Sequence, residues 1–429
     1  MTTFTKLAAC ATAALMGSTS LVMAQDCADP VKVGVLHSLS GTMAISETTL
    51  KDTMLMLIDA QNEKGGVLGC EIEAVVVDPA SDWPLFAEKA RELLTVNEVD
   101  VIFGNWTSVS RKSVLPVIEE LNGLLFYPVQ YEGEESSKNV FYTGAAPNQQ
   151  AIPATDYFLD ELGVEKFALL GTDYVYPRTT NKILEAYLKD KGIAEEDIFV
   201  NYTPFGHSDW SKIVADVVAL GADGKKVGVI STINGDANIG FYKELAAAGV
   251  SADDIPVVAF SVGEEELSGL DTSNLVGHLA AWNYFQSAES DANDEFVAAW
   301  KEYAGEQRVT NDPMEATMIG FNMWVKAVEA AGTTDVDAVR AEMYGLEVPN
   351  LTGGTAVMLP NHHLAKPVLI GEILEDGQFD IISQTEEVPG DAWTDFLPES
   401  AVLKSDWQEL ECGMYNTETS TCVQIKSNY

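Results

Sequence analysis

The sequence predicts an α/β protein made of two doubly wound halves, each with a parallel sheet. Short apolar runs of strand length alternate with longer amphipathic runs from Val31 onward, and the same alternation begins again near Pro153. Such alternation gives right-handed βαβ units and a parallel sheet that helices cover on both faces. The chain of 429 residues is long enough to build two or three hydrophobic cores.

In the first half, the apolar strand Val31–Leu36 leads through a polar loop into a helix over Ser46–Glu63. The helix has an apolar stripe at i, i+4, i+7 and i+8, starting at Leu50, and the pair Gly65-Gly66 ends it. The elements expected next are a strand over Glu71–Val77, a helix over Asp82–Val96 and a strand, loop, helix, strand and loop over Val99–Gly133.

The stretch Val99–Gly133 contains two loops that follow strands, one at 104–108 and one at 127–131. Because parallel strands end at the same edge of a sheet, these loops should lie side by side at a ligand crevice. Thr107 or Ser108 can cap the helix between them, so its positive end would face the same crevice. A capped helix beside a buried aromatic pair would explain these residues equally well.

The second half repeats the pattern, with strands expected over Lys166–Leu170, Ile198–Tyr202, Val227–Ser231 and Ile255–Phe260. A long strand over Asn274–Gln286, helices over Asp291–Tyr303 and Asp312–Ala331, and a ribbon of strands over Thr355–Ser383 follow. These last segments suit crossings that complete the two halves. The tail from Pro398 remains unassigned.

Residues 1–24 have the features of a secretory signal peptide. Lys6 precedes an apolar run, and Val22-Met23-Ala24 fits a small-residue cleavage site. Cys10 lies in a sequence that resembles a lipid-attachment box, but too little hydrophobic chain precedes it, so we interpret it as part of the removed peptide. No later run approaches the ~20 apolar residues of a membrane span, so we expect a mature protein that is soluble outside the cytoplasm, without direct membrane insertion.

The formal net charge of −41 becomes −42 once the signal with Lys6 is removed. Such an acidic surface repels nucleic acid and anionic lipid, and it argues against a phosphate-rich ligand. Four cysteines remain, and an even number in an oxidising compartment predicts two disulfides. Neighbouring strands favour Cys27–Cys70, which leaves Cys412–Cys422, although three pairings exist. No pair has the C-x-x-C spacing of a zinc site, so we predict no metal.

The sequence lacks a G-x-S-x-G nucleophile elbow, a phosphate-binding P-loop and a G-x-G-x-x-G dinucleotide motif. These absences lower the prospect of an enzyme, and no cofactor is expected. The adjacent His362 and His363 are expected in a surface turn. His37 follows the first strand and could line the crevice.

Hydrogen-bonding and aromatic residues gather at the strand ends instead. The candidates for ligand binding are Trp106, Thr107, Ser108, Tyr127, Gln130, Asp173, Tyr174, Tyr176, Asn234, Asp236 and Glu47. Arg178 is the one cation that we place near them, which favours a small, neutral, planar ligand over a free amino acid. Aromatic faces would enclose this ligand, hydroxyls would bind its carbonyl, and Asp236 or Asp173 would accept from its N–H groups. The alternatives to ligand binding are that the tyrosine and tryptophan side chains pack in the core and that Asp236 caps a helix.

Four long motifs carry a resemblance to a known family: FGNWTSVSRKSVLPV, FYPVQYEGEESSKNVFYTGAAPNQQ, GTDYVYPRTTNKI and STINGDANIGFY. The chain resembles the type I periplasmic binding proteins of ABC transporters, in the branched-chain amino acid group. Within that group these motifs are similar to the urea-binding and short-chain-amide-binding subfamily. The resemblance implies a Venus-flytrap fold of two lobes, joined by three hinge strands, that closes on a ligand.

The resemblance places Trp106, Ser108, Tyr127, Tyr174 and Tyr176 at pocket positions. The run YPVQYEG, with Gln130, is similar to the urea-binding pattern. It therefore implies a urea receptor that delivers its ligand to membrane permease subunits, with acetamide or another short amide as the alternative ligand. A secreted hydrolase of small amides is the alternative from another class.

The expected organisation has four parts. Residues 25–148 with about 284–350 form lobe 1, and residues 149–283 with about 351–397 form lobe 2. Residues 1–24 are the signal, and residues 398–429 are a C-terminal tail. Asp236 is our candidate for distinguishing urea from acetamide, since a buried carboxylate facing the second NH2 group is satisfied only by urea.

Overall fold

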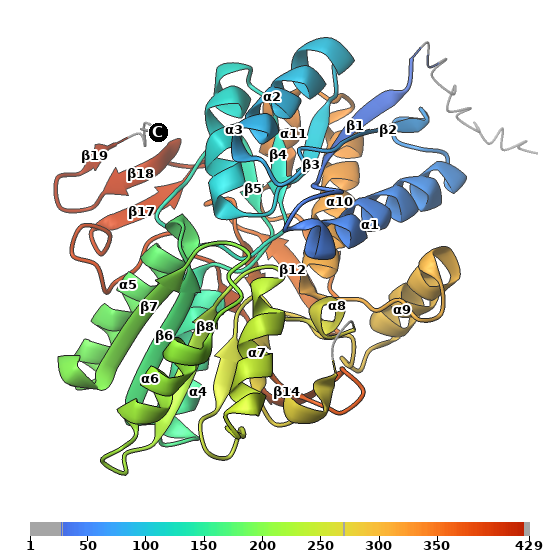
Figure 1. The fold of residues 1–429 in the computed structure, drawn as a ribbon. Coiled ribbons are helices and arrows are strands. Elements are labelled where there is room, and N and C mark those ends of the chain that lie inside the picture. Colours follow the sequence, from blue (N-terminus) through green and yellow to red (C-terminus); the bar gives the residue numbers. More distant parts are fainter. Residues whose placement is uncertain (1–26, 28, 269–270, 424–429) are drawn as a thin grey trace, which may run out of the picture.

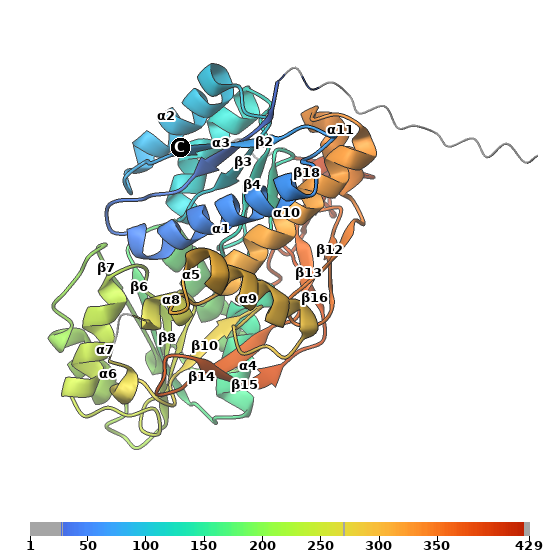
Figure 2. The same ribbon diagram turned by 90° about the vertical axis from the view of Figure 1, so that its right-hand side faces the viewer.

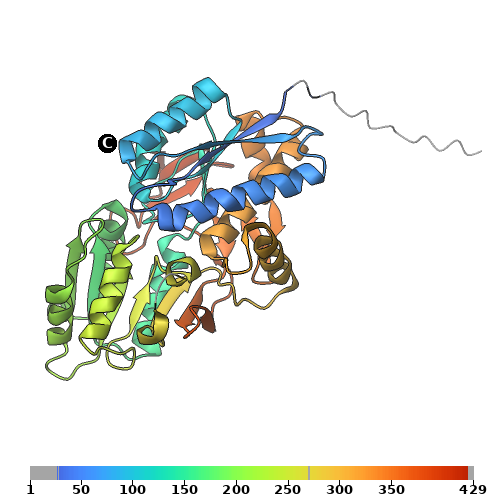
Figure 3. The ribbon, with the colours of Figure 1, turned by 45° about the vertical axis from the view of Figure 1, so that its right-hand side comes forward.

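The computed structural model describes residues 27, 29–268 and 271–423, and these form two α/β lobes with a small appended sheet (Figure 1). The expected signal peptide and Cys10 lie outside the described residues. Figure 3 shows the two lobes one above the other, with the long helix α1 (Ala44–Glu63, blue) along the side of the first lobe that faces the second. In the described part of the chain, no helix combines the length and the apolar character that crossing a bilayer requires.

The first lobe is built on a five-stranded parallel sheet of order β2-β1-β3-β4-β5. Its strands are β1 (Val31–Leu36), β2 (Ile72–Val77), β3 (Val101–Gly104), β4 (Leu125–Tyr127) and β5 (Val140–Tyr142). The helices that cover it are α1, α2 (Trp83–Glu92), α3 (Ser108–Glu120), α9 (Asp291–Ala304), α10 (Asp312–Ala331) and α11 (Val336–Met343). Helices α1 and α10 run side by side on one face (Figure 2), so a late segment of the chain completes the first core.

The second lobe has a seven-stranded sheet of order β15-β14-β10-β9-β8-β6-β7. Its strands are β6 (Lys166–Thr172), β7 (Ile198–Thr203), β8 (Val227–Thr232), β9 (Val257–Ala259), β10 (Leu279–Trp282), β14 (Leu369–Ile373) and β15 (Phe379–Gln384). Its helices are α4 (Ala151–Asp160), α5 (Val175–Asp190), α6 (Ser211–Leu220), α7 (Ala237–Ala247) and α8 (Glu264–Leu267). The strands of this sheet run in one direction except β14, which is antiparallel to both of its neighbours, and an apolar cluster packs on each face.

Asn283 ties together three passages of the chain between the lobes. Its side-chain amide donates hydrogen bonds to the carbonyl oxygens of Gln149, at 3.1 Å, and Pro367, at 2.7 Å. Gln149 lies between β5 and α4, Asn283 follows β10, and Pro367 precedes β14. These are the three hinge passages that the fold class implies. The chain returns once more after β15, where Val388 begins β16 (Val388–Pro389).

Two smaller sheets complete the structure. One has the order β11-β12-β13-β16, with β11 (Glu347–Pro349), β12 (Thr355–Met358) and β13 (Leu364–Lys366). We expected residues after 351 in lobe 2, but Ala356, Met358 and Leu364 of this sheet pack in the first core. The tail forms the other sheet, from β17 (Leu403–Asp406), β18 (Cys412–Asn416) and β19 (Thr421–Cys422).

Both expected cysteine pairs are disulfides in the structure. Cys27–Cys70, with a Cα–Cα distance of 5.5 Å, ties the segment before β1 to the start of β2. Cys412–Cys422, with a Cα–Cα distance of 5.8 Å, closes the tail sheet.

The long strand expected over Asn274–Gln286 is wrong. Only Leu279–Trp282 forms a strand, after a 3-10 turn at Thr272–Asn274. Gly277 has φ +87°, a left-handed conformation that interrupts an extended chain. The helix expected to end near Val96 also differs, because α2 ends at Glu92 and a π-helical turn occupies Leu93–Asn97.

Candidate functional site

The carboxyl edges of the two sheets face each other, and side chains connect the lobes there. The Gln130 amide, in the loop after β4, donates to the Phe260 carbonyl oxygen and to the Ser261 hydroxyl, both at 2.7 Å. On α1, the Ser46 hydroxyl donates to Glu266 at 2.6 Å, and burial raises the pKa of Glu266 to about 7. We call the space between these edges the interlobe crevice.

Tyrosines from both lobes gather in the interlobe crevice. Tyr174 packs against Tyr176, with ring centroids 6.2 Å apart, and against Phe205 at 4.9 Å. Desolvation raises the pKa of the Tyr176 phenol, and the nearby Glu132 and Tyr127 raise it further. Burial likewise raises the pKa of Tyr127. These phenols therefore stay protonated at neutral pH, and each can both donate and accept a hydrogen bond.

Several buried polar atoms of the crevice have no hydrogen-bond partner in the described part of the chain. They are Thr107 Oγ1, Tyr127 Oη, Gln130 Oε1 and Tyr176 Oη. Leaving a buried polar atom unpaired costs about 1 to 3 kcal/mol. Four such atoms at one interface, three from the first lobe and one, at Tyr176, from the second, indicate a site whose hydrogen bonds are completed by a polar ligand.

Thr107 occupies the N-cap of α3, but its side chain makes no capping hydrogen bond. Its hydroxyl is therefore free for a ligand. The other residues of the same loop are buried as well: Trp106 packs in the first core, and the Ser108 hydroxyl accepts from Arg111 at 3.2 Å.

Arg111 is a crevice residue that sequence reasoning missed. It is fully buried on α3, with its guanidinium 4.6 Å from the centre of the Tyr127 ring. It pairs with Glu135 at 2.7 Å and with Glu132 at 3.2 Å, and Lys112 also pairs with both carboxylates. Two cations thus face two carboxylates, so the cluster is balanced and Arg111 has its charge already compensated.

The three candidate acidic residues have different positions. Glu47 is fully buried: its Oε2 accepts from the Ser38 amide at 2.8 Å and lies 3.2 Å from His37 Nδ1, while its Oε1 has no partner among the described residues. Asp173 is exposed and pairs with Arg178 at 2.6 Å. Asp236 is exposed and occupies the N-cap position of α7, where its side chain makes no capping hydrogen bond. The hypothesis of a buried carboxylate at Asp236 is therefore wrong for this structure. The helix-cap alternative is right for the position of Asp236 but not for its side chain.

Asn234 lies beside these acidic positions and is buried. Its backbone amide donates to Thr172 Oγ1 at 2.9 Å, and its side-chain amide donates to the Thr232 carbonyl oxygen at 3.1 Å. These bonds hold the loop after β8. Next to it, a Cβ atom on Gly235 would lie 3.0 Å from the Thr42 carbonyl oxygen, so this loop closely approaches the first lobe.

The surface turn expected at His362 and His363 is wrong in two respects. His362 does close a turn, but His363 forms a β-bridge with Tyr142, and both side chains are fully buried. His362 stacks on Phe141 at 4.4 Å, and His363 stacks on Tyr142 at 4.9 Å. Burial lowers the pKa of both rings, to about 3 and about 4, so they are neutral packing groups. Within the described residues, no three His, Cys, Asp or Glu side chains are placed to hold a metal ion.

The fold and this crevice define a ligand-binding protein of the Venus-flytrap class. Residues 31–399 match the family "Periplasmic binding protein domain", and the chain belongs to that family. Within that family it is similar to substrate-binding proteins of ABC transporters, and these relatives are not enzymes.

Individual relatives agree with this class. The chain is 23% identical over 338 residues to Leu/Ile/Val-binding protein homolog 7 of Brucella melitensis, covering 74% of this chain and 82% of that protein. Its structure is similar, with a TM-score of 0.74 and 20% identity, to the solute-binding protein of an ABC transporter from Rhodopseudomonas palustris in complex with p-hydroxybenzoic acid. That similarity covers 85% of this chain and 99% of that one.

A third similarity is partial. A stretch of 111 residues is 32% identical to limonene hydroxylase of Geobacillus stearothermophilus. It covers 26% of this chain and 20% of that protein, so the chain spans about a fifth of the relative's length. This local match identifies no activity for the present chain.

Proposed function

We propose that the protein binds urea in the interlobe crevice and presents it to the permease of an importer. The observation that carries the proposal is the set of unpartnered buried atoms at Thr107, Tyr127, Gln130 and Tyr176. Three of them are hydroxyls that can donate to a carbonyl oxygen, and the Gln130 amide oxygen can accept from an N–H group. A small, planar molecule with one carbonyl and several N–H donors complements this set.

The charge balance of the crevice supports a neutral ligand. Arg111 and Lys112 both pair with Glu132 and Glu135, so their charges are already compensated. Burial lowers the pKa of His37 to about 3, which leaves that ring neutral as well. A carboxylate brought into such a site would lose its hydration without a new cationic partner. Leucine and p-hydroxybenzoate both carry that charge, whereas urea and acetamide do not.

We assign the discrimination between urea and acetamide to Glu47 instead of Asp236. Its Oε1 is buried without a partner, and burial raises the pKa of the carboxyl well above its usual range. If Glu47 Oε1 faces the second NH2 group of urea, it accepts a hydrogen bond from that group. If it faces the methyl group of acetamide, it accepts no hydrogen bond. Acetamide remains the alternative ligand if Glu47 does not contact that group.

Thermal melting with millimolar urea, acetamide, leucine and p-hydroxybenzoate tests the proposal. A ligand that binds only the folded protein stabilises it by about 2.7 kcal/mol at a hundredfold excess over Kd. We expect urea to raise Tm most, acetamide less, and the two carboxylates not at all. Stabilisation by leucine or p-hydroxybenzoate with no response to urea would overturn the assignment.

A further inference from the structure

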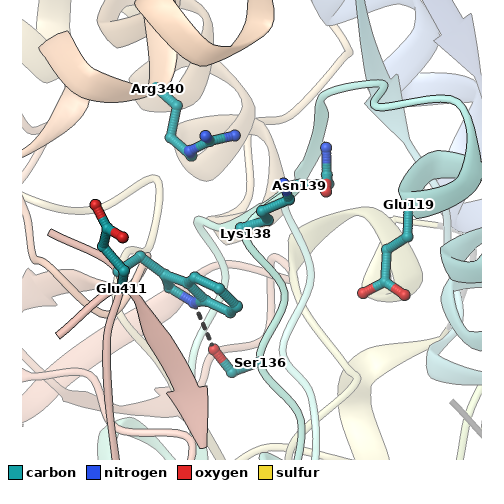
Figure 4. Close-up of a pocket in the computed structure, with 7 residues that line it drawn as sticks. Glu119, Ser136, Lys138, Asn139, Arg340 and Glu411 are labelled. Atoms are coloured by element: carbon teal, nitrogen blue, oxygen red, sulfur yellow. Dashed lines mark hydrogen bonds between the residues drawn. The ribbon is translucent and has the colours of Figure 1, made fainter. Parts of the chain in front are cut away.

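A cavity of about 470 Å³ lies between the first lobe and the tail sheet (Figure 4). Residues of α3, the segment before β5, α11 and the tail line it, and none of them belongs to the interlobe crevice. We call it the tail cavity. The family match ends at residue 399, so the sheet that forms one wall of this cavity lies beyond the matched domain.

Trp407 forms that wall and is held firmly. Its indole N–H donates to the Ser136 hydroxyl at 2.9 Å, and its backbone N–H donates to the Pro360 carbonyl oxygen at 2.9 Å. A Cβ atom on Gly413 would lie 2.1 Å from Trp407 Cζ2, so a residue without a side chain is required where β18 crosses the ring. The aromatic wall is therefore in place before any ligand binds, which reduces the ordering cost of binding.

Two cations, Arg340 and Lys138, line the cavity. Arg340 pairs through Nη2 with Asp337 at 2.8 Å, whereas its Nη1 is buried and has no partner among the described residues. Lys138 is exposed, and its charge attracts the carboxylates of Glu119 and Asp337. In Figure 4 Lys138 and Asn139 lie next to each other, and the Arg340 side chain extends from a separate helix on the other side of a gap.

Unused acceptors line the same cavity. Asn139 is fully buried, and its Nδ2 donates to Asn122 Oδ1 at 2.9 Å and to the Gly123 carbonyl oxygen at 2.7 Å. These two bonds fix the orientation of the amide, and they leave Asn139 Oδ1 without a partner in the described chain. Carboxylates stand at the two ends of the cavity, from Glu119 on α3 and from Glu411 in the tail. Glu119 Oε1 already accepts a hydrogen bond from the Ser137 hydroxyl at 2.8 Å.

We propose that the tail cavity is a second binding site, which takes a zwitterionic amino acid with an apolar side chain. Lys138 and Arg340 bind its carboxylate, Glu119 and Glu411 attract its ammonium group, and the Trp407 ring covers its side chain. A dianionic phosphate would meet both glutamates, and a simple cation would meet both basic residues. A molecule that carries one charge of each sign satisfies both sets of partners.

Calorimetric titration with L-phenylalanine, in saturating urea, tests this site. 3-Phenylpropionate lacks the ammonium group and phenethylamine lacks the carboxylate, so each should bind at least tenfold more weakly. Lys138→Gln and Glu411→Gln change exposed side chains and should each weaken phenylalanine binding at least fivefold. Trp407→Phe should weaken it as well, with the far-ultraviolet circular dichroism spectrum showing that the tail sheet persists.

Three results would overturn the proposal: no binding of phenylalanine, equal binding of the three probes, or full binding in both charge variants. Tyr176→Phe separates the two sites. If it abolishes phenylalanine binding while Lys138→Gln has no effect, the amino acid occupies the interlobe crevice, and the urea proposal fails together with this one. If urea does not bind but the tail-cavity variants still weaken phenylalanine binding, only the urea proposal fails.

Discussion

Gln130 of the first lobe and Phe260 of the second are joined by a hydrogen bond of 2.7 Å, from the side-chain amide to the backbone carbonyl oxygen. The same amide also donates to Ser261 Oγ, while its carbonyl oxygen has no partner among the described residues. Gln130 thus uses its donors to hold the lobes together and keeps its acceptor for a ligand. We infer that ligand binding and lobe closure are coupled at this residue.

Gln130→Leu should weaken urea binding and lobe closure together. Two interlobe hydrogen bonds, at about 0.5 to 1.5 kcal/mol each, correspond to a loss in affinity of roughly fivefold to a hundredfold. Calorimetry measures the affinity, and small-angle scattering should show that urea reduces the radius of gyration in the wild type but less in the variant.

Gln150→Leu is the matched control for this prediction. The Gln150 amide donates to the same Phe260 carbonyl oxygen, at 3.2 Å, but it also bonds to Ala281 of the second lobe and makes no link across the crevice. Gln150→Leu should lower the stability of the protein and leave its affinity for urea within about twofold of the wild-type value. Equal losses of affinity in both variants would show that Gln130 acts through stability alone.

Glu47→Leu should reduce the preference for urea over acetamide, since it replaces a buried acceptor with an apolar side chain of similar size. An unsatisfied buried acceptor costs about 1 to 3 kcal/mol, so the ratio of the two affinities should fall roughly tenfold or more. Asp236→Asn, at an exposed carboxyl, should leave that ratio unchanged. Titration of both ligands into both variants decides, and a change confined to Asp236→Asn would restore the hypothesis drawn from the sequence.

The sequence predicted the elements whose pattern is local. The bounds expected for β1 and α10 match the structure. An apolar run bounded by polar residues indicates a strand, and an N-capped amphipathic run indicates a helix, so both elements can be recognised from local sequence. The strand-end loops 104–108 and 127–131 were found for the same reason, because alternating elements determine which edge of a parallel sheet they share.

The charges of the site could not be predicted in this way. Arg111 lies in a run, SVSRKS, that is typical of a surface helix, and it is buried only because Glu132 and Glu135 return to it from a loop 21 and 24 residues later. The prediction of a buried carboxylate at Asp236 was wrong for the converse reason. Its position beside a strand end is a property of the sequence, but whether its carboxylate turns inward depends on how α7 packs, and here it faces solvent.

His278 should make the protein less stable in acid. Its Nδ1 accepts a hydrogen bond from the Val257 amide at 3.2 Å, and burial lowers its pKa to about 4. Below pH 6.5, the His278 ring binds a proton in the unfolded chain, where its pKa is about 6.5, but not in the folded chain. The contribution of His278 to the free energy of unfolding is therefore complete above pH 6.5. It is lost as the pH falls towards 4, by up to about 1.4 kcal/mol per pH unit.

His278→Asn retains an acceptor without this titration, so its stability should fall less steeply than that of the wild type between pH 6.5 and pH 4. Guanidinium chloride denaturation is the appropriate measurement, because urea is the proposed ligand. His207→Asn, at a half-buried position, controls for the loss of a histidine elsewhere in the protein. Parallel pH profiles for wild type and His278→Asn would contradict the prediction.

Arg111 should contribute far more to stability than a surface arginine with a similar partner. Arg111→Met would leave the buried carboxylates of Glu132 and Glu135 with Lys112 as their remaining cation, and breaking a buried ion pair costs about 3 to 5 kcal/mol. Arg91 makes an exposed pair with Glu120 at 2.6 Å, and Arg91→Met should cost at most about 1 kcal/mol. Denaturation of both variants in guanidinium chloride measures the difference.

Arg111→Lys keeps the charge but loses the two-sided contact with the carboxylates, so its loss of stability should fall between those of Arg111→Met and Arg91→Met. A loss for Arg111→Met as small as that for Arg91→Met would mean that the buried glutamates take up protons when the guanidinium is removed, and a stability that then improves at low pH would identify that response.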